Sequence, residues 1–200
     1  VRSRGLGDVY KRQPKDICLA EREGRGHPWK PVPADELKAI NTRDNEGMPS
    51  LTPDECEIYF HSDRHGTYGQ NDIWVAVRAS RDSPWGTPRN LEEINGLGNE
   101  RQACISSDGL TLWWTKANAG EIWQASRKSR KSAFGPARLV EAPVNSYLPE
   151  GQLEVSPRWP AVGAPAYFVR DSGETKGTLS TDIFMVTWNP APVAADKQEP

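Results

Sequence analysis

The clearest pattern in the chain is a short run that starts with an acidic residue and continues as an apolar, often aromatic strand. Such a run occurs four times, spaced 56, 49 and 61 residues apart, as Asp16–Ala20, Asp72–Ala76, Glu121–Ala125 and Asp182–Val186. Within Ile73-Trp74-Val75 every position is apolar, whereas a strand with one wet face alternates apolar with polar residues. The pattern therefore predicts strands buried on both faces.

Other features recur in the same order between these runs. Each of the first three runs is followed by an aromatic residue and then by an Asn-x4-Glu motif. Two consecutive aromatic residues lie beyond that motif. The members are Trp29, Trp85 and Phe134; Asn41/Glu46, Asn95/Glu100 and Asn145/Glu150; and Tyr59-Phe60, Trp113-Trp114 and Tyr167-Phe168. Because several independent positions recur together, the chain is built from repeats that begin near residues 16, 72, 121 and 182.

One repeat contains four expected strands, and tight-turn residues such as Ser107-Asp108-Gly109 separate them. In the best-defined repeat we expect the strands at 49–52, 58–61, 72–78 and 89–91. Four-stranded units of about 50 residues, each covered by its neighbours, are typical of β-propeller blades. The sequence predicts an all-β fold: a partial, open propeller over residues 14–190, with about three antiparallel blades and the start of a fourth. A closed propeller typically has 4–8 blades.

The stretch PSLTPDECEIYFHSDRHGTYGQNDIW, residues 49–74, resembles the WD40-like repeats of the TolB type, whose units read like PSLSPDG-x-x-LYFSSDR-x-GG-x-x-DIW. The resemblance extends from residue 16 to about 188, and Glu55 stands where that repeat has a turn glycine. It implies a six-bladed propeller for the full protein and a periplasmic or exported setting.

Both ends of the chain are expected to lie outside this fold. Residues 8–13, DVYKRQ, read as a translated sequencing adapter, so we expect residues 1–13 to be non-native and the original N-terminus, with any signal peptide, to be missing. The Pro- and Ala-rich residues 191–200 are expected to form a flexible tail.

Composition removes several classes of function. The longest apolar stretch is far shorter than the roughly 20 residues of a membrane-spanning helix, and mean hydropathy is −0.71. A net charge of −2 gives no long-range attraction for nucleic acid or anionic lipid. Three scattered cysteines, Cys18, Cys56 and Cys104, are too few for a disulfide framework or a zinc site.

No recognisable catalytic motif is present. The sequence lacks a Gly-x-Ser-x-Gly elbow, an HExxH helix, a P-loop and a dinucleotide fingerprint. The segment from Ser106 to Trp113 is similar to a sialidase Asp box, but Asp108 and Gly109 are adjacent where that motif separates them. We predict no catalytic residue, cofactor or metal, and interpret His61 and His65 as exposed loop histidines.

The charged residues that recur in each repeat are interpreted as structural. We expect Asp72, Glu121 and Asp182 to accept hydrogen bonds from turn N–H groups. The acidic residues that enter each innermost strand are given the same structural role, with a carboxylate ring that attracts a cation or basic peptide as the alternative: Glu46, Glu100 and Glu150. The basic run Arg127–Lys131 is predicted to be a solvated turn.

These features favour a non-catalytic binding scaffold that holds a protein or peptide on its loops, with a polysaccharide stacked on tryptophans as a further option. The candidate binding residues are those that differ between repeats: Arg64, His65, Tyr68, Gln70, Arg101 and Lys116. The alternative is the propeller domain of a carbohydrate-active enzyme or serine oligopeptidase whose catalytic residues lie outside this chain. An open arc is also expected to expose apolar blade faces and to associate through them.

Overall fold

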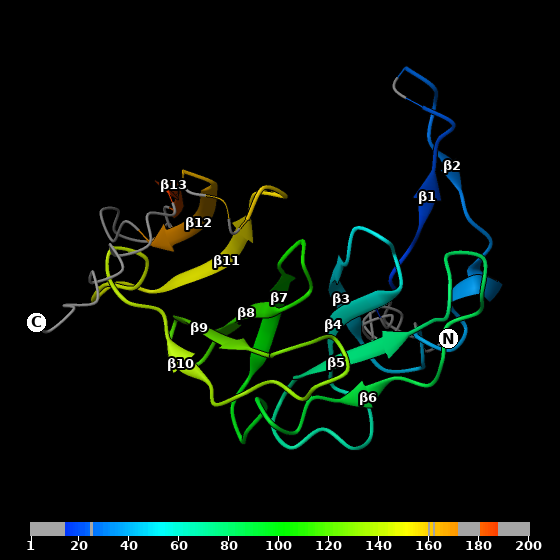
Figure 1. Ribbon diagram of the computed structural model, residues 1–200. Helices are drawn as coiled ribbons and strands as arrows, with labels where there is room; N and C mark the ends of the chain where they lie inside the picture. Colours follow the sequence, from blue (N-terminus) through cyan, green and yellow to red (C-terminus); the bar gives the residue numbers. More distant parts are fainter. Residues whose placement is uncertain (1–14, 25, 160, 162, 172–180, 188–200) are drawn as a thin grey trace, which may run out of the picture.

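The computed structural model describes residues 15–24, 26–159, 161, 163–171 and 181–187. Within these residues every element is a β-strand apart from one 3-10 turn, η2 (Ala34–Leu37), and the sheets stand side by side as an open arc (Figure 1). This confirms the predicted partial propeller. The expected non-native segment 1–13 and the expected tail 191–200 fall outside the described residues.

Three of the sheets are blades, and each runs antiparallel from an innermost to an outer strand. Blade 1 consists of β3 (Glu46–Leu51), β4 (Glu57–Ser62), β5 (Asp72–Val77) and β6 (Arg89–Asn90). Blade 2 consists of β7 (Glu100–Ile105), β8 (Thr111–Lys116), β9 (Glu121–Ser126) and β10 (Arg138–Leu139). Blade 3 shows three strands among the described residues, namely β11 (Glu150–Val155), β12 (Pro165–Asp171) and β13 (Thr181–Thr187).

The first repeat differs from the prediction. Instead of a strand over 16–20, the chain pairs only β1 (Ala20–Glu21) with β2 (Lys30–Pro31), a ribbon that projects beside blade 1 (Figure 1). Residues 16–19 are not part of a strand in the described part of the chain: the Val32 N–H donates to the Leu19 carbonyl, and the side-chain amide of Asn41 bonds both backbone groups of Ile17. This repeat therefore covers blade 1 without forming a full sheet of its own.

Apolar side chains from both faces of each blade form separate cores between neighbouring blades. Tyr59 of β4 points into the core shared with blade 2, whereas the adjacent Phe60 points into the core shared with the first repeat. Trp113 and Trp114 divide in the same way between blades 3 and 1. The continuous apolar runs are therefore explained by burial on both faces, as predicted from the sequence.

Each innermost strand contains a β-bulge with a residue in the left-handed region, at Met48, Gln102 and Gln152 (φ 48°, 57° and 51°). β3 starts at Glu46, three residues before the predicted strand, because Glu46 and Gly47 also pair with β4 on the other side of the bulge. Glu55 has φ 56°, close to the 72° of Gly109 in the matching turn of blade 2, so a glutamate here adopts a conformation that favours glycine.

Candidate functional site: the loop face

The end of the blades at which each innermost strand begins is here called the loop face. It carries the β4–β5 loop (63–71), the β8–β9 turn (117–120) and the inter-blade loops 41–45, 95–99 and 145–149. A repeated side chain anchors each inter-blade loop: the Asn amide accepts from the backbone N–H and donates to the carbonyl of one isoleucine. The pairs are Asn41–Ile17, Asn95–Ile73 and Asn145–Ile122, with distances of 2.7–3.0 Å.

A second repeated bond joins neighbouring units at this face. The backbone N–H of the glutamate that opens each innermost strand donates to the carbonyl just before the third strand of the preceding unit. The bonds run from Glu46 to Lys15, from Glu100 to Asn71 and from Glu150 to Gly120, at 2.7–2.9 Å. These bonds and the Asn clamps hold the loops on a rigid frame.

The three glutamate side chains are buried, with at most 4% exposed, so they do not form an open carboxylate ring. Thr42 and Ser62 donate to Glu46, which also lies 3.0 Å from the guanidinium of Arg64. Ser146 and Arg170 donate to Glu150. Burial raises the pKa of Glu100, and its Oε2 atom has no partner. Thus two of the three glutamates are neutralised by an arginine.

The acidic residues at the third strands have three different environments. Asp72 is fully buried and accepts from the Tyr68 N–H at 2.9 Å and from the Asn90 amide at 2.6 Å. Glu121 accepts from the Trp123 indole at 3.0 Å, and Asp182 is exposed in β13. Asp72 thus has the turn N–H bond expected from the sequence, whereas the loop that precedes Asp182 lies outside the described residues.

Arg64 is not available for a partner, and the expectation that it projects from the loops is wrong. Its side chain is only 9% exposed, pairs with Glu46, and donates to the carbonyl of Ile40. The guanidinium also stacks against Phe60 and Trp74, 4.9 and 5.2 Å from the ring centroids. The buried carboxylate draws this arginine inward.

The other five candidates lie at or near the loop face with different freedom. His65 and Tyr68 are exposed, and Tyr68 is 50% accessible. Gln70 is exposed but accepts from the Asn99 amide at 3.2 Å. Lys116 is partly buried over the Trp123 ring, 4.0 Å from its centroid, and Arg101 is partly buried at the start of β7. His65, Tyr68 and Gln70 are thus the accessible members.

Two exposed apolar residues on this face were not predicted from the sequence. Leu97 is 88% exposed and Tyr147 is 94% exposed, and they occupy matching positions in consecutive inter-blade loops. Gly69 packs directly on this loop, because a Cβ on Gly69 would lie 2.8 Å from the carbonyl carbon of Leu97. The backbone next to Tyr68 therefore touches the backbone of Leu97. In the sequence, these two residues are marked only by their equal distance from the Asn clamps: Leu97 and Tyr147 each follow the clamp Asn by two residues.

The two histidines do not share one environment. His65 is exposed, but His61 lies within β4, with its ring against Gly47, which corrects its interpretation as a loop residue. Burial, together with Arg101 and Lys15, lowers the pKa of His61 to about 4. Among the residues that the structure describes, no group of three His, Cys, Asp or Glu side chains could hold a metal ion.

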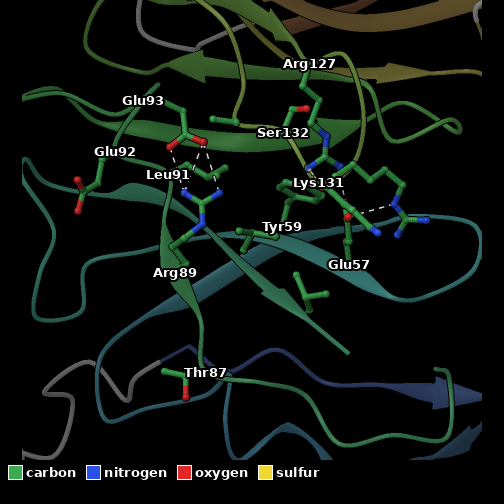
Figure 2. Close-up of a pocket in the computed structure, with 14 residues that line it drawn as sticks. Glu57, Tyr59, Thr87, Arg89, Leu91, Glu92, Glu93, Arg127, Lys131 and Ser132 are labelled. Carbon is green, nitrogen blue, oxygen red and sulfur yellow. Dashed lines mark hydrogen bonds and ion pairs between the residues drawn. The ribbon is translucent and has the colours of Figure 1, made fainter. Parts of the chain in front are cut away.

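A cleft of about 840 Å³ lies between blades 1 and 2 (Figure 2). On one side, Arg89 pairs with Glu93 at 3.1 Å. On the other, Glu57 accepts from Arg127 at 2.6 Å and from Arg130 at 3.0 Å. The basic run is therefore not a solvated turn, since two of its arginines join blade 2 to blade 1.

The Glu57 carboxylate, which is paired with both arginines, remains ionised. Burial alone would raise the pKa of Glu57, but hydrogen bonds from Tyr59, Arg127 and Arg130 outweigh it and lower the pKa. Arg127 also stacks on Phe134, 4.7 Å from its centroid, as Arg78 stacks on Trp85 at 4.3 Å. Of the charges in the cleft, those paired with Glu57 join the two blades.

Comparison with known proteins supports the fold and does not identify a family. No family model matches the chain, and no curated protein matches it. The solved structure of TolB from Acinetobacter baumannii is similar, with a TM-score of 0.53 at 18% identity over 90% of this chain and 37% of that one. This chain thus spans little more than a third of the TolB chain. Within the described residues, no helix has the length and apolar character needed to cross a bilayer.

Proposed function

We propose that this protein is a non-catalytic binding scaffold that engages a protein or peptide through its loop face. One observation carries the proposal: Tyr68, Leu97 and Tyr147 expose large apolar side chains on loops whose backbones are hydrogen-bonded into the blades. Isolated exposed apolar residues are common on protein surfaces. Here Leu97 and Tyr147 occupy matching places in consecutive inter-blade loops, and the loop that carries Tyr68 packs against the first of them.

Rigid loops favour binding because little conformational freedom is lost when a partner docks. The Asn95 and Asn145 clamps fix the two inter-blade loops before any contact is made. Tyrosine is also enriched at the centre of protein interfaces, where a few apolar anchors contribute most of the binding energy. We propose Tyr68, Leu97 and Tyr147 as these anchors.

Polar candidates at the same face would form the rim of the interface. His65 and Gln70 are exposed beside Tyr68, and Lys116 is partly exposed at the end of β8. Such mixed polarity suits a polypeptide ligand better than a strongly charged one. The resemblance of the repeats to the TolB type supports a periplasmic or exported setting as part of the proposal.

The test uses peptides selected against the wild-type chain from a random peptide display library. A triple variant, Tyr68→Ala with Leu97→Ala and Tyr147→Ala, is expected to weaken their binding at least about tenfold, because interface anchors contribute about 2 kcal/mol or more each. Binding is measured by biolayer interferometry. Since the three side chains are largely exposed, the urea midpoint should stay close to that of the wild type.

A matched control removes exposed apolar residues from outer strands instead. Val77→Ala with Leu139→Ala takes away side chains that are 53% and 43% exposed, and these changes should leave peptide binding intact. The proposal fails if the selected peptides bind the triple variant as tightly as the wild type, or if the outer-strand control loses binding to the same extent.

A further inference from the structure

Most of the cationic side chains that line the cleft between blades 1 and 2 already have a carboxylate partner. On the blade 1 wall, Arg89 of β6 pairs with Glu93 at 3.1 Å. On the blade 2 wall, Arg127 and Arg130 pair with Glu57 at 2.6 and 3.0 Å. These arginines therefore have no charge left uncompensated.

Lys131, also on the blade 2 wall, differs from these arginines. It lines the cleft and is exposed, and no ion pair reaches it among the residues that the structure describes. The remaining carboxylate of the lining, Glu92, is exposed on the opposite wall, beyond the Arg89–Glu93 pair as seen from Lys131 (Figure 2). The cleft therefore has one ammonium group without an anionic partner.

The backbone on both sides of Lys131 is fixed by hydrogen bonds. The Arg127 guanidinium donates to the carbonyl of Arg130 at 3.1 Å. The Ser132 N–H donates to the Ser129 carbonyl at 3.0 Å, and the two serine hydroxyls bond each other at 2.9 Å. Lys131 thus extends from a turn that is already ordered, so little backbone freedom would be lost on binding.

This turn does not itself require a lysine. Blade 1 has the same turn, in which the Ser83 N–H donates to the Ser80 carbonyl at 3.0 Å and the two hydroxyls lie 2.8 Å apart. Asp82 occupies the position of Lys131 there. Because the turn forms with either charge, the residue at this position sets the charge of the cleft without deciding the fold.

The blade 1 side of the cleft also has an apolar strip. Val75 and Val77 lie two positions apart on β5, so they share one face of the sheet. Val77 is 53% exposed, and Tyr59 and Leu91 lie buried beneath the cleft. In Figure 2, Tyr59 lies between the Arg89–Glu93 pair and Lys131. The cleft thus combines an apolar strip with an unpaired cation, and its volume of about 840 Å³ is within the usual range of small-molecule sites.

We propose that this cleft binds a small organic carboxylate with an apolar body. The carboxylate would accept a charge-assisted hydrogen bond from the Lys131 ammonium, and the apolar body would cover Val77. An ammonium alone would hold any anion, and an apolar strip alone would hold any apolar molecule, so the two together select this class. The site does not depend on the peptide binding proposed for the loop face.

Phenylbutyrate is the probe that tests the ligand class. It is titrated at pH 7 into the chain carrying carbon-13 labels in its valine methyl groups, and NMR follows the Val77 signals. We expect a Kd in the millimolar range or below, as for other ligands of this size, and at least about tenfold weaker binding of the uncharged phenylbutyramide and of butyrate, which lacks the ring. An amide that binds as tightly as the acid, or Val77 signals that stay unchanged up to about 20 mM phenylbutyrate, overturns the proposal.

Two lysine variants test the site. Lys131→Met is expected to raise the Kd for phenylbutyrate at least about tenfold. Lys128→Met is the matched control, because Lys128 is an exposed lysine of the same basic run that does not line the cleft, and it should change the Kd by less than about twofold. Both side chains are exposed, so neither change should alter the Tm appreciably. Equal effects of the two variants on binding overturn the proposal.

The loop-face triple variant keeps this test separate from that of the proposed function. Tyr68→Ala with Leu97→Ala and Tyr147→Ala should bind phenylbutyrate as the wild type does, because none of the three residues lines the cleft. Loss of phenylbutyrate binding in this variant would place the ligand at the loop face and overturn the cleft proposal.

Discussion

Blades 1 and 2 make the same inter-blade backbone bond at the loop face, but the glutamate side chain beside that bond has different partners in the two blades. Glu46 and Glu100 both open an innermost strand, and each donates its N–H to the preceding unit at 2.8 and 2.9 Å. Each of the two residues is 1% exposed. Glu46 has two hydroxyl donors and an arginine, whereas no ion pair among the described residues reaches Glu100.

Blade 3 resembles blade 1, although its arginine comes from another position. Arg64 follows β4, whereas Arg170 lies within β12 at the position that Lys116 occupies in β8. Both arginines pair with a glutamate, stack on two aromatic rings, and donate to a backbone carbonyl of the inter-blade segment. Lys116 instead stacks on Trp123. The longer, forked guanidinium can make all these contacts, and an ammonium cannot.

The comparison shows which part of the repeat is essential to its geometry. The backbone N–H of the glutamate makes the inter-blade bond in all three units, so the bond does not depend on the carboxylate. The carboxylate adds a buried charge that must be compensated. Blade 2 retains that charge with fewer partners. Its loop-face end is therefore expected to contribute less to the stability of the protein.

The largest expected effect comes from removing the arginine of blade 1. Arg64→Met leaves the Glu46 carboxylate buried without its cation, and the free energy of unfolding should fall by about 3–5 kcal/mol. Urea denaturation followed by tryptophan fluorescence measures this loss. Lys116→Met provides the matched change in blade 2, where the stacking contact with Trp123 and the electrostatic attraction to Glu100 are lost but no ion pair is broken, and should cost about 1 kcal/mol or less. Equal losses of stability in the two variants would contradict the proposed difference between the surroundings of Glu46 and Glu100.

The repeated strands could be predicted because their signal is local. Consecutive aromatics such as Tyr59 and Phe60 require cover on both faces, and the structure places them in two different cores. The role of Arg64 could not be predicted, because it depends on the inter-blade loop folding back to bring Glu46, 18 residues earlier, beside it. The Asn-x4-Glu spacing was visible, but its partner, the third-strand isoleucine, lies 22–24 residues away.

The exposed anchors were missed for a related reason. Leu97 and Tyr147 are ordinary apolar residues in sequence, and nothing local separates them from core residues such as Ile94. Their exposure follows from the Asn clamps, which direct the preceding residue inward and leave the loop tip outside. Burial is thus set by tertiary bonds that no short pattern contains.

A smaller effect is expected from giving blade 2 the hydroxyl that the other blades have. Thr42 and Ser146 donate to Glu46 and Glu150, and Gly96 holds the matching position before Glu100. A Cβ on Gly96 would meet nothing within 4 Å, so serine fits. Gly96→Ser should raise the free energy of unfolding by about 1–2 kcal/mol, through a hydrogen bond to a charged group and reduced entropy of the unfolded chain.

Gly24→Ser separates these two contributions. A Cβ on Gly24 also meets nothing within 4 Å, but a serine there has no buried carboxylate to bond. Only the entropic part of the increase in the free energy of unfolding should therefore appear in urea denaturation. If Gly24→Ser stabilises the protein as much as Gly96→Ser does, Glu100 does not lack a donor.

The smallest expected effect is a change in how stability depends on pH. Burial raises the pKa of Glu100, so between its ordinary and raised pKa the folded state binds more protons than the unfolded state. Stability contributed by the neutral carboxyl is therefore lost as pH rises above about 4.3. Glu100→Gln should remove this decline, stabilising the protein at pH 7 relative to wild type but not at pH 4.

Glu57, whose pKa is lowered by its partners, has the opposite dependence, and Glu57→Gln should destabilise at pH 7 more than at pH 4. Urea midpoints measured from pH 4 to 7 distinguish the two, and parallel profiles for both variants would refute the assignment of an uncompensated charge to blade 2.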